Sequence, residues 1–518
     1  MRLALWGMAA AVTVTAQYVP PPPSLASSAA VEQTAQGRRP ALPVIQGFEG
    51  LGADLAAPGT TPRNPSDNSL AVGPSHVMQT VNSQIAIFSK LDGRLVYGPL
   101  PTNTMFAGSG EVCGSRPNGD AVVRYDQLAN RWLVVMPIFR RVARGEPAPE
   151  GKPSNPGPAA RPGPPPPLPS TPQPPVKDGT YAICYAVSAT ADPLGEYYRY
   201  VFDRPLFPDY PRPAVWPDGY YTPTSTGDDV IEKHVCVADR VRMLRGEPAT
   251  EQCIVIDGVN FLNTADLDGT ALPPAGAPNI VMATGGTQLR HDIDDDGIYA
   301  WKVFADWQDP SRTRVTGPRK ILVAPYRYLC GGQLTSCVPQ PGTDRRLDAQ
   351  GDKIMSRLVY RNVGGRASIV AVHSVDTTAG GGGVRWYEFR LDANGDPQLA
   401  QQSTYAPDGL YRWIASPAID GAGNIAIGYS FGGTPHFVGQ RFAARAASDP
   451  AGTLTFHESV LAEGQAPQTN TLRWEDYTQT AMDPSDDCTI WYVGDYLKKD
   501  AITYSTRIGA FRVPGCGA

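Results

Sequence analysis

The sequence predicts an all-β fold, a single β-propeller of about seven four-stranded blades, with six to eight blades compatible. The observations behind this are a high glycine and proline content and an internal repeat with no amphipathic helix between its units. The 518 residues include 53 glycines and 52 prolines, and proline is about twice its average frequency of roughly 5%. Proline interrupts helices and central strands, so this content favours short strands joined by turns. A large β-sandwich or a β-helix is the alternative fold.

The repeat consists of a strand that ends in a small apolar motif, a tight turn and a second strand. Copies occur at 71–74 before SHVMQTV, 214–217 before DGYYTP, 418–421 before AGNIAIGYS, and 481–484 before SDDCTIWYV. Proline, glycine or aspartate forms each turn. We therefore interpret the acids from Asp483 to Asp487 as turn residues.

Further hairpin patterns extend the repeat along the chain, at 120–135, 279–307 and 357–375. The units recur about every 50 to 70 residues, and Kelch-type propeller blades are roughly 50 residues long. We expect one propeller domain at 65–518, with a Pro-rich loop insertion at 144–177.

The N-terminus has the form of a secretion signal. Met1 and Arg2 make a short basic start, 3–14 is apolar, and 14–16 offers small residues for cleavage. No later stretch approaches the roughly 20 apolar residues of a membrane-spanning helix. We expect a signal peptide at 1–16, a flexible leader rich in Pro, Ala and Ser at 17–64, and a secreted protein, extracellular or periplasmic.

Eight cysteines in an exported chain favour disulfides over metal ligation, and no C-x-x-C pair is present. Eight cysteines allow 105 pairings. Proximity in the sequence suggests Cys236–Cys253 and Cys330–Cys337. Elimination then leaves Cys113–Cys184 and Cys488–Cys516.

The formal net charge of −5 argues against a nucleic-acid or anionic-membrane partner. The remaining partner classes are an extracellular glycan or a protein ligand. We expect the protein to be a monomer.

Acidic and aromatic residues stand just upstream of the repeated motif. In a propeller the innermost strands line a central channel, so the loops before them surround one mouth of it. The candidate ligand-binding residues at this mouth are Asp67, Asp120, Asp209, Tyr210, Arg412, Trp413, Asp476 and Tyr477. The alternative is that each Asp only caps a turn by accepting from backbone N–H groups.

Arginines in consecutive units add a second pattern: Arg361, Arg385, Arg412 and Arg473, of which the last three are each followed by Trp. A guanidinium group binds carboxylates bidentately, and flat aromatic faces suit sugar rings. We therefore predict that these arginines contribute to ligand binding at the axial mouth. The alternative is a set of salt bridges between blades.

Seven strings occur in order from about residue 65 onward: SDNSLAVGPSHVMQTVN, YAVSATADPLGEYYRY, DYPRPAVWPDGYY, GVRWYEFR, RWIASPAIDGAGNIAIGYS, DPSDDCTIWYVGDY and TRIGAFRVPGC. Together they resemble a family of exported bacterial β-propeller proteins, mostly uncharacterised and distantly sialidase-like. In that family the last unit usually reads Arg-Trp-Gly-Asp-Tyr, whereas here Glu475 stands in the glycine position. This adds a carboxylate and weakens any transfer of a backbone conformation that needs glycine.

Several Arg, a Glu and a Tyr that converge on an axial pocket are also typical of a sialidase type of site, which uses a tyrosine nucleophile. On this hypothesis Tyr477 is the nucleophile, Glu388 or Glu475 is its partner, and Asp67 or Asp120 is the acid/base. No repeat meets the sialidase Asp-box spacing cleanly.

Residues 291–297 contain D-x-D-x-D-G, the start of a calcium-binding loop. Asp292, Asp294 and Asp296 are the candidate calcium ligands. Val303 stands where an EF-hand has its bidentate Glu, so an acidic hairpin turn is the alternative.

These observations predict a secreted, disulfide-stapled propeller that binds an extracellular ligand, a glycan in the leading hypothesis, at its axial mouth. A sialidase-like glycoside hydrolase is the second hypothesis. A cell-surface or matrix interaction scaffold without a small ligand is the third.

Overall fold

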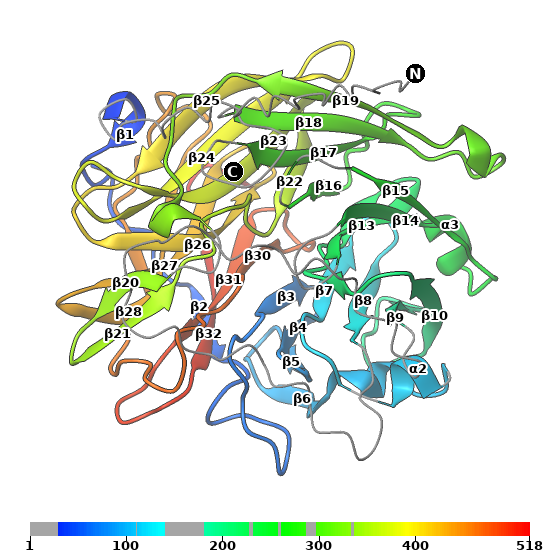
Figure 1. Cartoon of the computed structure of the whole chain (residues 1–518), viewed down its shortest axis with the longest axis horizontal. Coiled ribbons are helices and arrows are strands. Elements are labelled where there is room, and N and C mark those ends of the chain that lie inside the picture. Colours follow the sequence, from blue (N-terminus) through cyan, green and yellow to red (C-terminus); the bar gives the residue numbers. More distant parts are fainter. Residues whose placement is uncertain are drawn as a thin grey trace, which may run out of the picture.

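Antiparallel strands make up most of the computed structural model (Figure 1). The structure describes residues 29–109, 111–115, 117–139, 181–226, 232–256, 259, 261–285, 297–332 and 336–517. The predicted signal peptide, the insertion at 144–177 and the calcium ligands Asp292, Asp294 and Asp296 lie outside these ranges.

The first three sheets are each formed by strands that follow one another in the chain. One contains β3 (Ser69–Val72), β4 (His76–Val81), β5 (Gln84–Ser89) and β6 (Leu95–Pro101). The next contains β7 (Val122–Asp126), β8 (Arg131–Ile138), β9 (Tyr181–Ser188) and β10 (Tyr197–Arg204). The third contains β11 (Pro208–Asp209), β12 (Ala214–Trp216), β13 (Gly219–Thr226), β14 (Glu232–Ala238) and β15 (Glu251–Val255).

The largest sheet consists of three further meanders joined at their edges. They are β16 (Asn263–Leu267), β17 (Asn279–Gly285), β18 (Gly297–Phe304) and β19 (Arg314–Ile321); β22 (Leu358–Val363), β23 (Arg366–Asp376), β24 (Gly382–Leu391) and β25 (Pro397–Tyr405); and β26 (Tyr411–Ile419), β27 (Ile425–Gly433), β28 (His436–Arg445) and β29 (Ser459–Ala462). Parallel pairing of β16 with β22, and of β24 with β26, joins them.

The last sheet combines the two ends of the described chain. It contains β30 (Gln479–Met482), β31 (Thr489–Tyr496), β32 (Ser505–Arg512) and β2 (Gln46–Glu49). A separate hairpin joins β20 (Ser336–Gln340) to β21 (Thr343–Asp348), and β1 (Glu32–Gln33) pairs with β25. The helices are short: η1 (Ala29–Val31), η2 (Thr102–Phe106), α2 (Glu111–Gly114), α3 (Arg240–Met243), η3 (Pro310–Arg312) and η4 (Leu329–Gly331).

The sheets have a propeller-like arrangement around a common centre, so the all-β propeller prediction is confirmed at this level (Figure 1). The inner strand of each meander contacts the inner strand of the next, in the order β3, β7, β12, β16, β22, β26, β30 and back to β3. Side chains reinforce these contacts. Ser69 Oγ donates to Gln479 Oε1 at 2.8 Å and accepts from Val123 N at 3.1 Å, which connects β30, β3 and β7.

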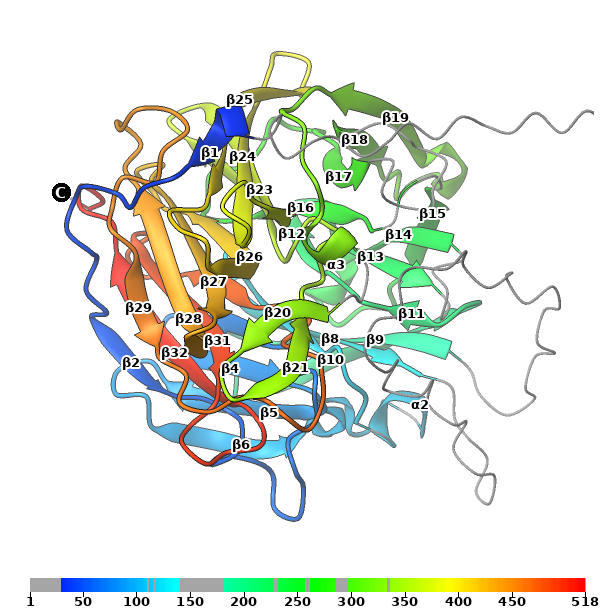
Figure 2. The ribbon, with the colours of Figure 1, turned by 60° about the vertical axis from the view of Figure 1, so that its left-hand side comes forward.

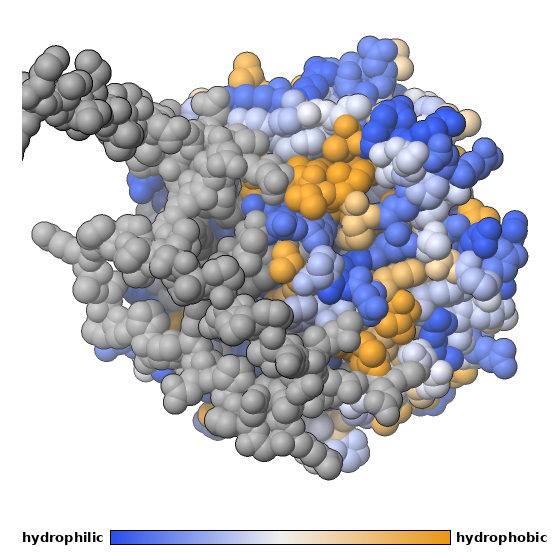
Figure 3. Space-filling model, turned by 45° about the vertical axis from the view of Figure 1, so that its right-hand side comes forward, coloured by the Kyte–Doolittle hydropathy of each residue, from blue (hydrophilic) through white to orange (hydrophobic). Residues whose placement is uncertain are grey.

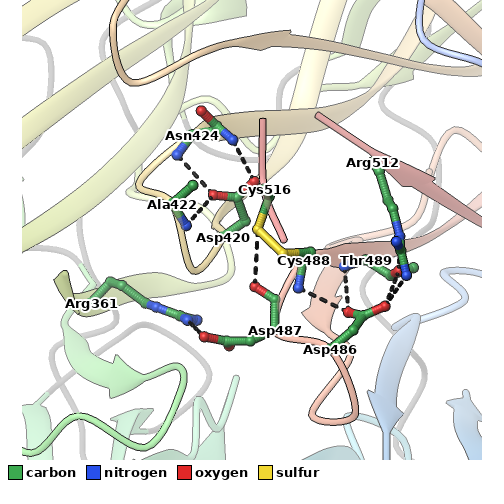
Figure 4. Close-up of a disulfide and its surroundings, with 10 residues drawn as sticks. All are labelled: Arg361, Asp420, Ala422, Asn424, Asp486, Asp487, Cys488, Thr489, Arg512 and Cys516. Atoms are coloured by element: carbon green, nitrogen blue, oxygen red, sulfur yellow. Dashed lines mark hydrogen bonds and ion pairs between the residues drawn. A yellow bond between two sulfur atoms is a disulfide. The ribbon is translucent and has the colours of Figure 1, made fainter. Parts of the chain in front are cut away.

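The acids of the repeat turns cap backbone N–H groups, as their position predicts. Asp420 Oδ1 accepts from the N–H groups of Ala422 and Asn424, each at 2.9 Å. Asp486 Oδ1 accepts from those of Cys488 and Thr489, at 2.9 and 2.8 Å (Figure 4).

The N-terminal segment differs from the predicted flexible leader over residues 29–64. β1 runs beside β25, and β2 pairs with β32 as the outer strand of the last sheet (Figure 2). The physical reason is that β32 would otherwise present an unpaired edge, and Phe48 packs its ring 5.2 Å from that of Phe88. Composition alone does not reveal strand pairing of this kind.

All four predicted disulfides are present: Cys113–Cys184, Cys236–Cys253, Cys330–Cys337 and Cys488–Cys516. Figure 4 shows the last of them beside the turn that contains Asp487. In the described ranges no helix is long and apolar enough to cross a membrane. On the face in Figure 3, hydrophobic residues form separate patches among hydrophilic ones.

Candidate functional site at the axial mouth

Five aspartates lie together in the segments that lead into the inner strands. Asp67 precedes β3, Asp120 precedes β7, Asp209 ends β11, Asp348 ends β21, and Asp476 precedes β30. The Asp476 carboxylate acts electrostatically on each of the other four. We call these residues the aspartate ring. Four of its members belong to the mouth predicted from the sequence, and Asp348 is an addition.

The backbone is left-handed at matching positions around this ring. The angle φ is 51° at Asp67, 55° at Tyr210 and 45° at Ile414, each four residues before the alanine of the repeat. Asp120 and Asp476 also adopt it, with φ of 57° and 64°. Residues with a Cβ adopt this conformation rarely, Asp and Asn more readily than others, and such strain is concentrated at functional sites.

Hydrogen bonds tie one side of the ring together. Asp67 Oδ2 accepts from Asn82 Nδ2 at 2.7 Å and from the backbone N–H of Asp120 at 3.3 Å. The hydroxyl of Tyr477 donates to Asp120 Oδ1 at 3.3 Å. The side chains of Asp120 and Asp209 also lie in hydrogen-bonding contact with each other.

A second group of contacts supplies positive charge. Arg473 Nη2 donates to Asp476 Oδ1 at 2.6 Å, and Arg473 Nε lies 3.0 Å from Asp348 Oδ2. Gln350 Nε2 donates to Asp476 Oδ1 at 2.9 Å. The ammonium of Lys353 also acts electrostatically on two members of the ring, Asp209 and Asp348.

Aromatic rings and cations lie beside the carboxyl groups of the aspartate ring. The rings of Tyr210 and Tyr477 meet edge to face at 5.4 Å, and Phe261 meets Tyr210 at the same distance. The Arg212 guanidinium lies 3.5 Å from the centre of the Tyr210 ring, and Lys353 Nζ lies 4.0 Å from the centre of Phe261. The ring is therefore bounded by flat apolar faces.

Burial and mutual repulsion raise the pKa values of several of these acids. Burial raises the pKa values of Asp67 and Asp120 well above the usual range, and neighbouring carboxylates raise them further. Burial also raises the pKa of Asp209 to about 6, and that of Asp348 to about 7 despite the nearby Arg473. Carboxyl groups with raised pKa values bind protons more readily than isolated aspartates, and a protonated carboxyl group donates as well as accepts hydrogen bonds.

Two buried polar groups at this site have no partner among the described residues. They are Asp67 Oδ1 and the Nε and Nη2 atoms of Arg212. The side chains are almost fully buried, with 2% of Asp67 and 6% of Arg212 exposed. Buried polar groups are nearly always hydrogen-bonded in proteins, so these atoms indicate that a ligand or water completes the site.

The ring lacks the spacing of a metal centre. Within the described ranges, the three potential ligands close enough to share one ion are Cys236, Glu251 and Cys253. The two cysteines form a disulfide, so they are not free to bind a metal.

Of the four predicted arginines, Arg473 is the one that contacts the aspartate ring, through Asp348 and Asp476. Arg361 lies within β22 and pairs with Asp487. Arg412 is fully buried in β26, with Nε 2.7 Å from Glu458 Oε1 and Nη1 2.8 Å from Asp408 Oδ1. These two side chains thus make ion pairs within the protein.

Arg385 and Trp413 also make contacts within the protein instead of lining the mouth. Arg385 Nη1 donates to the backbone oxygen of Ala324 at 3.0 Å, and its Nε donates to Thr404 Oγ1. Trp413 is fully buried in a core cluster with Trp474. Both residues lie on strands, where side chains alternate between packed faces of the sheets.

The proposed glutamate partners of Tyr477 do not contact it. Glu475 Oε1 accepts from Gln440 Nε2 at 2.8 Å and from the backbone N–H of Asp495 at 2.6 Å. Glu388 Oε1 accepts from Ser368 Oγ at 2.9 Å on β23. The hydrogen-bond partner of Tyr477 is Asp120.

Sequence reasoning missed Asp348, Arg212, Lys353, Gln350 and Phe261. A signal existed for Arg212, which stands two residues before the repeated Ala214. Asp348 begins the segment 348–357, which leads into β22, whereas the arginine pattern pointed to Arg361 within that strand.

No family model matches the chain, and no curated protein matches it significantly. Among solved structures, a protein of unknown function from Dyadobacter fermentans is 9% identical, with a TM-score of 0.39, over 92% of this chain and 100% of that chain. A PL25 polysaccharide lyase described as an ulvan lyase is 12% identical, with a TM-score of 0.38, over 90% and 94%. A subtype N10 neuraminidase-like protein of A/little yellow-shouldered bat/Guatemala/060/2010 is 7% identical, with a TM-score of 0.35, over 78% and 100%.

Proposed function

We propose that the aspartate ring binds a hydroxyl-rich ligand, a glycan, at the axial mouth of an exported propeller. The observation that carries this proposal is the ring itself, in which carboxyl groups with raised pKa values stand beside Tyr210 and Tyr477. Sugar hydroxyls both donate and accept hydrogen bonds, and the apolar faces of sugar rings pack on aromatic side chains.

The unpartnered atoms fit the same ligand. Asp67 Oδ1 accepts from a hydroxyl group, and Arg212 Nη2 donates to one. Each such contact replaces a missing hydrogen bond of a buried group, whose absence costs about 1–3 kcal/mol.

The blade count is also part of the proposal: the propeller has seven four-stranded blades. The circuit of inner strands from β3 to β30 supports it, with β2 as the fourth strand of the last blade. The four disulfides support export, because such bonds persist in oxidising compartments.

The test measures glycan binding by Asp209→Asn, because Asp209 is only half-buried and its substitution removes one charged acceptor. We expect a glycan array to identify a ligand of the wild type, and calorimetry to show about tenfold weaker binding for the variant. Asp344→Asn, an exposed aspartate on the β20–β21 hairpin, is the matched control and binds as the wild type does. Equal affinity of both variants would refute the role of the ring. Absence of any sugar ligand would favour the interaction scaffold.

A second candidate function, glycoside hydrolysis of the sialidase type, is favoured by the contact between Tyr477 and Asp120. Sialidases use a tyrosine nucleophile, and here the Tyr477 hydroxyl donates to Asp120 Oδ1 at 3.3 Å. In this candidate Tyr477 is the nucleophile and Asp120 is the acid/base.

Fluorogenic glycosides separate the two candidates. Hydrolysis requires turnover that is lost in Asp120→Asn, and the sialidase type requires loss in Tyr477→Phe as well. Binding without turnover of any substrate would leave the binding function alone.

Calcium binding by Asp292, Asp294 and Asp296 remains part of the proposal. It predicts a rise in melting temperature on addition of calcium that magnesium does not reproduce. The rise disappears in Asp294→Ala if the loop binds the ion, and an undiminished rise in that variant contradicts the assignment.

A further inference from the structure

A cleft of about 250 Å³ lies between the sheet of β22–β25 and the strands β26–β28. It is at the opposite end of the inner strands from the aspartate ring. The ring segment that contains Asp348 leads into β22 at its beginning, whereas Val363, at the end of this strand, lines the cleft.

Four arginines face two acids in this cleft. The lining includes Arg361, Arg366, Arg390 and Arg445, together with Glu388 and Asp449. This excess of positive charge is local, because the chain as a whole has a net charge of −5.

Both acids are already engaged by neighbouring groups. Glu388 accepts from Ser368 Oγ at 2.9 Å and also from Gln401 Nε2. Asp449 accepts from Arg39 Nη1 at 3.2 Å and from the backbone N–H of Ala446 at 2.7 Å. They offset part of the charge that the four arginines bring, and an excess of arginine remains.

Two of the guanidinium groups are buried, and in each of them one nitrogen atom lacks an acceptor. Arg361 and Arg445 are each 3% exposed, and Arg361 Nη1 and Arg445 Nε have no hydrogen-bond partner in the described chain. Arg361 uses Nη2 to reach Asp487, as Figure 4 shows. Arg445 Nη2 donates only to backbone oxygens, that of Asp449 at 2.6 Å among them.

The other two arginines are accessible at the surface. The side chain of Arg390 is 54% exposed, with Nε 3.4 Å from Glu388 Oε1. Arg366 is exposed, and among the described residues its side chain makes no hydrogen bond or ion pair. A ligand that enters from solvent thus meets two exposed guanidinium groups before the two buried ones.

We propose that this cleft is an anion-binding site that takes a small ligand bearing a sulfate or carboxylate group. Guanidinium groups bind the oxygens of such anions bidentately, and the anion supplies the acceptors that Arg361 and Arg445 lack. The volume lies below the roughly 300–1,000 Å³ of typical small-molecule pockets, which suits a single anionic group on one ring. The proposal does not depend on the function of the aspartate ring.

The test uses isothermal titration of the full chain with two probes, inorganic sulfate and glucuronate, at an ionic strength held constant with chloride. We expect saturable binding of at least one probe. In the double variant Arg366→Gln/Arg390→Gln binding is expected to weaken by about tenfold or more, since each exposed guanidinium donates to the anion. Because these two side chains are exposed, the variant is expected to keep the wild-type melting temperature.

The matched control is Arg245→Gln, whose side chain is 64% exposed and belongs to the loop after α3. Weaker binding in the double variant with unchanged binding in the control supports the site. The probe that binds then identifies the sulfate or the carboxylate as the group recognised. Equal affinity in both variants, or no saturable binding of either probe, overturns the proposal.

Discussion

Glu475 has a strained left-handed backbone, and the hydrogen bonds of its buried side chain stabilise it there. Its φ is 52°, the left-handed region in which glycine is favoured and other residues are strained. The carboxyl group is fully buried and bonded to Gln440, Ser430 and the backbone of Asp495. Burial raises its pKa well above the usual range, and the nearby Asp495 adds to this.

We predict that Glu475→Gly destabilises the protein even though glycine suits the backbone. Relief of the left-handed strain contributes about 1–2 kcal/mol. Loss of the side chain leaves Gln440 and the Asp495 N–H without their acceptor, at about 1–3 kcal/mol each. Urea denaturation should therefore show a net loss of up to about 5 kcal/mol.

Glu475→Gln is the matched control because an amide resembles the protonated acid in shape and hydrogen bonding. Its free energy of unfolding should remain close to that of the wild type. A glycine variant more stable than the wild type would show that backbone strain dominates at this position.

At the scale of elements, the decisive feature is the strand β2. Its register pairs Gln46 with Ala510 and Glu49 with Arg507, so a segment near the N-terminus covers the outer edge of the last sheet. The short stretch QGFE has no alternating apolar pattern, and its pairing depends on the edge that β32 presents.

We predict that Phe48→Ala weakens this closure. Phe48 packs against Phe88 and against Trp491, whose ring centre is 6.2 Å away. Because Phe48 is half-buried, the loss should be about 1–3 kcal/mol, below the roughly 3–5 kcal/mol of a fully buried Phe. Chemical denaturation measures it.

Ile45→Ala serves as the comparison, since Ile45 lies beside β2 and its side chain is largely exposed. It should change the free energy of unfolding by less than about 0.5 kcal/mol. Equal effects of the two substitutions would argue against packing of β2 as a source of stability.

At the scale of the whole molecule, the ends of the chain are joined and acids are gathered at one mouth. Asn68 Nδ2 donates to Asp495 Oδ1 at 3.1 Å, and Gln79 Nε2 donates to Thr506 Oγ1 at 2.9 Å, so the first and last sheets interlock.

Burial raises the pKa values of Asp348 and Asp495 to about 7. The folded protein thus holds protons that the unfolded chain releases near pH 4.

We predict that these acids make the free energy of unfolding fall as the pH rises from 4 to 7. Their folded pKa values are raised, so their stabilising contribution is complete below about pH 4 and is lost as the pH rises through 7. Each group contributes a slope of up to about 1.4 kcal/mol per pH unit. In Asp348→Asn one such group is removed, and the variant should gain stability relative to the wild type across this interval.

Asp344→Asn should run parallel to the wild type over the same pH range, because Asp344 is exposed on the surface. Melting temperatures at half-unit steps provide the measurement. Parallel curves for Asp348→Asn and the wild type would contradict the prediction.

The sequence by itself determined the all-β class, the repeated strand–turn–strand unit and four members of the aspartate ring, each of which depends on local pattern or on strict repetition. It suggested the disulfide pairs only by proximity and elimination. The capping of turns by Asp420 and Asp486, and the left-handed Asp67 and Asp476, are consequences of residue type at a fixed place in the repeat.

Only the tertiary structure decided which side chains face one another across sheets. In the folded protein Arg361 pairs with Asp487, and Arg412 pairs with Glu458. Glu475 bonds to Gln440, and Asp348 belongs to the ring beside Arg473. The physical reason is that a side chain's partner depends on the packing of segments hundreds of residues apart. Neither residue type nor repeat position specifies that packing.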